Sequence, residues 1–184
     1  MRLELDAPSS AWVRVPTDLP SEHGEAWADE ALEGVRRRHP DASAEQLAAV
    51  RQLVLRARDG LLPGAAVGLL YLPEPRPFGL LVSIGVSEPE AVEGSLVRAL
   101  LGEAELVGRP IVDPVEVPAI GSGISVRCLF APAAADRKPA AGLAYLLQGE
   151  RATVRVMASP APQELVAHAA PSLGKIVASL RLVD

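Results

Sequence analysis

The stretch GLAYLLQGERATVRVMASPAPQELVAHAAPSLGKIVASLRLVD, residues 142–184, decides the fold that we expect for this chain. In its first part every second residue is apolar, as on one face of a β-sheet, at Leu143, Tyr145, Leu147, Val154 and Val156. The segment between the two runs, residues 148–151, is short and contains Gly149, as a hairpin needs where φ turns positive. These residues predict a β-hairpin.

The second part of the same stretch predicts a helix. One apolar stripe runs along it, at Leu165, Ala169, Leu173, Ile176 and Leu180. Because the hairpin and the helix each have one apolar face to bury, we expect the helix to pack on the hairpin. Pro171 lies inside the helical run and should kink it or split it at Ala170, since proline has no N–H to donate to the preceding turn.

The rest of the chain also mixes the two periods. Alternating or continuous apolar runs predict strands around Leu3 and Val13 and over residues 64–72, 78–86, 115–117 and 124–130. Residues 7–10 have the composition of a turn between the first two strands. We therefore predict an α+β fold, with a mainly antiparallel sheet of about six to eight strands flanked by about four helices.

Three of these helices lie upstream of the closing one. Residues 22–60 predict a helical hairpin, whose second helix has a capping box at Ser43 and Gln46 and a left-handed stop at Gly60. Ser87 predicts the cap of the third helix, which includes Val92. At 184 residues we expect one domain over 1–184, with the helical hairpin inserted ahead of the main sheet.

Composition narrows the class of protein. No apolar run is long enough to cross a membrane and no secretory signal precedes the first strand, so we expect a cytoplasmic protein with no membrane span. One cysteine, Cys128, allows no internal disulfide. A net charge of −5 argues against binding of nucleic acid. Two lysines against sixteen arginines, with abundant alanine, glycine and proline, indicate a bacterial genome of high GC content.

The residues that could carry chemistry have simpler explanations. Cys128 falls in phase with Val126 and Phe130, so it should lie in the core as a small apolar side chain. The three histidines are scattered and show no spacing typical of a metal site. The Gly121–Gly123 turn fits neither a phosphate loop nor a nucleophile elbow. We expect no catalytic residues, no metal and no cofactor.

One cluster of charge could face a partner. Arg36, Arg37 and Arg38 end a predicted helix, where cations complement the negative end of the helix dipole. The structural role is the simpler interpretation. If an acidic partner binds this chain, these three arginines are the predicted partner-binding residues.

The order of these segments resembles that of a known group. The segments that carry the resemblance are WVRVP at residues 12–16, VEVPAIG at 115–121, TVRVMASP at 153–160 and IVASLR at 176–181. They are similar to uncharacterised actinobacterial proteins that in turn resemble the PsbP-like fold of a Ran-binding import factor, an extrinsic photosystem II protein and LpqN-type lipoproteins. The resemblance covers about two thirds of the chain. It implies an antiparallel sheet flanked by helices and proteins that bind partners, and it brings no active-site residue with it.

Two functions remain open, with an enzyme as a third and weaker hypothesis. The first is a non-enzymatic interaction or accessory module that binds another protein through an exposed apolar or arginine-edged patch. The alternative is a carrier of a small apolar ligand in a cleft between sheet and helices, which requires a pocket above about 300 Å³. Neither hypothesis fixes the oligomeric state or the identity of the partner.

Overall fold

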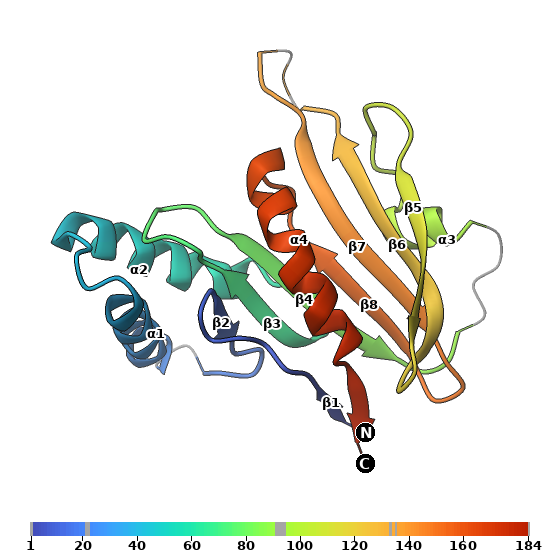
Figure 1. Ribbon diagram of the computed structural model, residues 1–184, viewed down its shortest axis with the longest axis horizontal. Coiled ribbons are helices and arrows are strands. Elements are labelled where there is room, and N and C mark those ends of the chain that lie inside the picture. Colours follow the sequence, from blue (N-terminus) through green and yellow to red (C-terminus); the bar gives the residue numbers. More distant parts are fainter. Residues whose placement is uncertain (1, 21–22, 91–94, 133, 135, 184) are drawn as a thin grey trace. The chain divides into compact units, whose positions relative to one another are not determined.

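The computed structural model describes residues 2–20, 23–90, 95–132, 134 and 136–183. They form two compact units, Ala7–Ser83 and Met1–Asp6 with Ile84–Asp184. Four helices are present in the described residues, α1 (Gly24–Arg38), α2 (Ala44–Asp59), α3 (Leu96–Leu101) and α4 (Gln163–Ala178) (Figure 1). The strands are β1 (Arg2–Glu4), β2 (Trp12–Val15), β3 (Ala65–Tyr71), β4 (Leu80–Ser87), β5 (Ile111–Val117), β6 (Gly121–Phe130), β7 (Ala140–Gln148), β8 (Thr153–Ala158) and β9 (Arg181–Val183).

Seven strands form one mainly antiparallel sheet in the order β2-β3-β4-β8-β7-β6-β5. Strands β5, β6, β7 and β8 form a continuous meander in which each strand pairs with the next along the chain. The predicted α+β class with its antiparallel sheet is therefore confirmed. The boundary between the two units falls inside β4, between Ser83 and Ile84. Whether the chain behaves as one domain remains a prediction.

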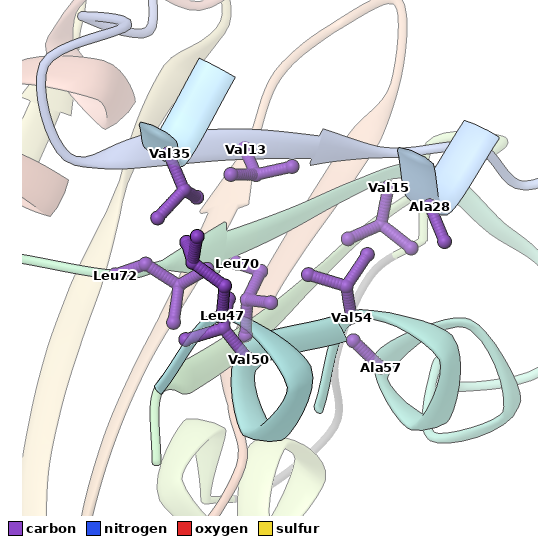
Figure 2. Packing of buried hydrophobic residues seen from close by; sticks show 10 residues of the cluster. All are labelled: Val13, Val15, Ala28, Val35, Leu47, Val50, Val54, Ala57, Leu70 and Leu72. Atoms are coloured by element: carbon purple, nitrogen blue, oxygen red, sulfur yellow. The ribbon is translucent and has the colours of Figure 1, made fainter. Parts of the chain in front are cut away.

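The first unit buries a core between its helical hairpin and its strands. Apolar side chains from α1 and α2 meet those of β2 and β3, and the cluster contains Val13, Val15, Ala28, Val35, Leu47, Val50, Val54, Ala57, Leu70 and Leu72 (Figure 2). The predicted capping box is present, because the Ser43 hydroxyl accepts from the Gln46 N–H at 3.1 Å and the Gln46 amide oxygen accepts from the Ser43 N–H at 2.8 Å.

In the second unit, α3 and α4 cover opposite faces of the meander (Figure 1). Leu100 of α3 packs with Val126 and Leu146 on one face. Leu165, Ala169, Leu173 and Ile176 are buried along α4, which contacts β7. The predicted packing of the closing helix on the hairpin of β7 and β8 is thus confirmed.

α4 is one helix from Gln163 to Ala178 with Pro171 inside it, so the predicted split at Ala170 is wrong. Pro171 cannot donate to the carbonyl of Ala167, four residues earlier. Both residues are exposed to solvent, where water can satisfy the carbonyl that lacks its helical donor. The buried stripe on the other side of α4 holds the helix together across the proline.

Three local predictions need correction. Gly60 ends α2 with φ of −87°, so the stop is right-handed, and Gly149 is absent from the glycines with positive φ. Gly149 is needed for space instead, since a Cβ there would collide with the Ile120 carbonyl oxygen. Ser87 ends β4, and α3 is capped by Ser95, whose hydroxyl accepts from the Arg98 N–H at 3.4 Å. Val92 lies outside the described residues.

β1 and β9 form a separate two-stranded antiparallel sheet in which Arg2 lies opposite Val183. The predicted turn between β1 and β2 therefore does not join paired strands. The N–H of Asp6 donates to the Ser179 hydroxyl at 2.9 Å, which ties the end of β1 to the end of α4. No helix in the described part of the chain is long and apolar enough to cross a membrane.

Candidate functional site

A cleft of about 500 Å³ opens within the second unit, between α4 and strands β5 to β7. Its sheet side includes Ile111, Leu129 and Ala141, and its helix side includes Val166, Ala170 and Pro171. The register explains the sheet side, because Ile111 lies opposite Arg127 and Leu129 lies opposite Ala141. Residues opposite each other in neighbouring strands point to the same face, so these four side chains project toward α4.

The hollow exists because the helix offers small side chains to this part of the sheet. Ala167, Ala170 and Pro171 are three and four residues apart, so they lie on one face of α4. Ala141 opposes them from β7. With methyl groups and a proline ring in place of longer side chains, the helix and sheet leave space that larger residues fill further along α4.

The lining is apolar except at a few points. Of the thirteen lining residues, Arg109 and Arg127 are the only charged ones. The Arg127 guanidinium donates to the Asp113 carboxylate at 2.8 Å, so its charge is already matched. Arg109 has no hydrogen-bond or ion-pair partner among the described residues, and its side chain is exposed. The cleft therefore has one positive charge that the described part of the chain does not neutralise.

The rim of the cleft is also apolar. Val107 and Ile111 line the cleft and are 44% and 55% exposed. Val112, which is 42% exposed, is next to Ile111 in the chain and faces the other side of the sheet. They lie within six residues of each other, at the start of the edge strand β5 and just before it. Isolated exposed apolar residues are normal on a protein surface, whereas a group beside a cleft is typical of a binding site.

Cys128 is buried, as the sequence predicted. It is paired with Gly142, and both lie on the face of the sheet that carries Val126 and α3. Cys128 therefore reaches the cleft through its backbone, and its thiol points to the opposite face. Burial raises the pKa of the Cys128 thiol, against a smaller lowering by a hydrogen bond with the Gly142 backbone.

The three predicted partner-binding arginines lie in the last turn of α1, in the other unit. Arg36 pairs with Glu33 at 2.7 Å, and Arg38 donates to the carbonyl oxygen of Ser9 at 3.0 Å. Desolvation and the neighbouring Arg37 lower the pKa of Arg38. Two of the three are thus engaged within their own unit. Their role in binding a partner remains a prediction.

The described residues contain no group of three or more His, Cys, Asp or Glu side chains that could hold a metal ion.

A second pocket, of about 330 Å³, lies in the first unit between residues 16–19 and 58–65. Its residue Arg58 donates to the Leu19 carbonyl oxygen at 2.7 Å, which holds the loop before α1 against the end of α2. The Arg58 side chain in this pocket therefore has a structural role.

The sequence did not identify the cleft. The sequence pattern predicts a strand only over residues 115–117 at this edge of the sheet, whereas β5 begins four residues earlier at Ile111. Two prolines, Pro110 and Pro114, obscure the strand pattern, and the charged Asp113 interrupts the apolar face that Ile111 and Val115 would share. The small residues of α4 at positions 167, 170 and 171 were the other available signal.

Comparison with known proteins gives little more. No protein-family model matches the chain, and no curated protein matches it. Among solved structures, the solution structure of cyanobacterial PsbP (CyanoP) from Synechocystis is similar at a TM-score of 0.43 and 9% identity, over 99% of this chain and 93% of that one. The actinobacterial and LpqN-type resemblance remains a prediction.

Proposed function

We propose that this protein is a non-enzymatic interaction or accessory module, and that the cleft between α4 and β5 to β7 holds its partner. The observation that carries the proposal is an open apolar cleft of about 500 Å³ beside exposed apolar side chains on an edge strand. Sites of this kind, apolar with a few polar groups that fix orientation, are typical of ligand and partner recognition.

The lining favours binding over catalysis. No Asp, Glu, His, Ser, Thr or Tyr is among the thirteen residues that line the cleft in the described part of the chain. General acid–base catalysis requires a titratable side chain within hydrogen-bond reach of the substrate. The Cys128 thiol does not supply a nucleophile here, because the pairing with Gly142 places it on the other face of the sheet.

Site-specific photo-crosslinking tests this proposal. A benzoylphenylalanine at Ile111, which lines the cleft, should give a discrete cross-linked protein in cells that express the chain natively. The matched control carries the same group at Phe78, which is 46% exposed and does not line the cleft, and should give none. Equal products from both positions, or no product from Ile111, would contradict the proposal.

A small apolar ligand is the second candidate, because the cleft volume of about 500 Å³ falls in the range of small-molecule pockets. Native mass spectrometry of the full chain, purified from its own host, should then detect a bound apolar molecule that is released on denaturation. Ala170→Trp places an indole in the cleft and should abolish that binding. If the purified protein carries no such molecule, the result contradicts the ligand carrier and favours the interaction module.

A further inference from the structure

We propose that the partner presents a short peptide segment in which a carboxylate lies next to branched apolar side chains. The carboxylate binds the guanidinium of Arg109, and the apolar side chains enter the cleft beside Ile111 and Val166. This inference rests on the proposed function, because it names the chemistry of the segment that the cleft accepts.

The charges of the cleft point to an anionic group. Its two charged lining residues are both arginines, and Arg127 is already matched by Asp113 at 2.8 Å. Asp113 is neutralised by the same pair, so it does not repel an incoming carboxylate. No described residue pairs with Arg109, so its charge and its five N–H donors are open to an external acceptor. The planar guanidinium matches the geometry of a carboxylate, which it can bind through two hydrogen bonds.

The shape of the apolar surface points to a peptide. Ile111 lies opposite Arg127 and faces α4, while Val112 lies opposite Val126 and faces the other side of the sheet. Both are exposed, so apolar surface continues from the cleft around the edge of β5. A small molecule inside the cleft would cover Ile111 only. A chain that passes along the edge of β5 covers both.

Prolines limit how such a segment can bind. Pro114 has no N–H, so it cannot donate a hydrogen bond to β6. The residues of β5 that bond to β6 are therefore alternate ones such as Asp113, and the backbone groups that face the open edge of β5 are those of Pro110, Val112 and Pro114. Val112 alone has an N–H to offer on this edge among these three residues. The segment is therefore recognised mainly by its side chains, since extended strand addition needs a regular row of donors.

Affinity selection from defined peptide pools tests the inference. One pool contains acetylated, amidated pentapeptides with a central Glu and Ile, Leu or Val at the other positions, and the matched pool has Gln at the centre. On the full chain we expect the Glu pool to be retained about fivefold more than the Gln pool, as for an exposed ion pair. Arg109→Gln should remove this preference, and the control Arg14→Gln, an exposed arginine of β2, should preserve it.

The outcomes separate the inference from the proposed function. If the wild-type chain retains both pools equally, the inferred role of the carboxylate is wrong. The cleft is still the binding site if Ala170→Trp abolishes the retention of both pools. If neither pool is retained, the inference that the cleft binds a peptide is wrong. Cross-linking at Ile111 then tests the proposed function by itself. If dodecanoate binds with the same dependence on Arg109 while the peptides do not, the occupant is a small amphiphile and the peptide is wrong.

Discussion

At Gly123 the backbone of β6 comes so close to β7 that a Cβ would collide with the carbonyl oxygen of Leu146. We expect Gly123→Ala to lower the free energy of unfolding by about 2–3 kcal/mol, because the two strands must move apart to admit a methyl group. The control is Gly85→Ala in β4, where a Cβ meets nothing within 4 Å and the change should stay within about 1 kcal/mol. Urea denaturation measures both, and equal effects would contradict the steric explanation.

The raised pKa of Cys128 predicts low reactivity at neutral pH. Because the thiolate is the nucleophile, the native protein should react with a disulfide reagent much more slowly than the urea-unfolded chain, and its rate should rise with pH only above the usual range for a thiol. The sign for stability follows from the same shift. A pKa that is higher in the folded state favours folding below the unfolded pKa, and this contribution is lost as pH rises through the folded pKa. A native rate equal to the unfolded rate at pH 7 would contradict the burial of Cys128.

Residue environments could be predicted from the sequence where the local pattern decides them. Cys128 follows the alternation of Val126 and Phe130, and it is buried as expected. Arg38 could not be placed in the same way, because its acceptor is the carbonyl of Ser9, 29 residues away along the chain. The partner of a long polar side chain depends on the tertiary fold.

At the scale of one element, Pro171 gives a further prediction for α4. Pro171→Ala supplies the N–H that the Ala167 carbonyl lacks, which stabilises the folded state. Alanine also gives the unfolded chain more conformational freedom, which offsets part of this gain, so the free energy of unfolding should rise by about 1–2 kcal/mol. Pro75→Ala, in the connection between β3 and β4, should give no gain, because that segment is not helical. An unchanged or lower stability of the α4 variant would show that contacts of the proline ring outweigh the missing hydrogen bond.

Elements with a strong period could be predicted, and their ends could not. The stripe of α4 and the alternation of β7 and β8 give both the elements and their packing. The predicted start of α3 is wrong because Ser87 and Ser95 both have cap chemistry, and the local sequence does not show that β4 extends to Ser87. The cleft depends on the register of β5 with β6, which the local sequence does not encode.

For the whole molecule, β4 provides the reason to expect one cooperative unfolding transition. Its residues Leu80–Ser83 belong to one compact unit and Ile84–Ser87 to the other. Both tryptophans, Trp12 and Trp27, lie in the first unit, whereas circular dichroism reports on all helices and strands. If the chain is a single domain over 1–184, fluorescence and circular dichroism should follow the same denaturation curve.

Two core substitutions sharpen this prediction. Leu70→Ala in the first unit (Figure 2) and Leu173→Ala in α4 each remove a buried side chain, and each should lower the free energy of unfolding by about 2–5 kcal/mol. With one transition, either substitution shifts both probes together. If Leu173→Ala moves the circular dichroism curve and leaves the fluorescence curve in place, the two units are separate domains.

The pairing of β1 with β9 has a mechanical consequence. Arg2 lies opposite Val183 and Glu4 lies opposite Arg181, so residues 2 and 183 are at the same end of the two-stranded ladder. A force applied between them in an optical trap would open the ladder like a zipper, one pair after another, in place of shearing all pairs at once. Short antiparallel ladders loaded in this geometry resist little force. The β1–β9 pair should therefore open first, at a low force, while the seven-stranded sheet remains folded.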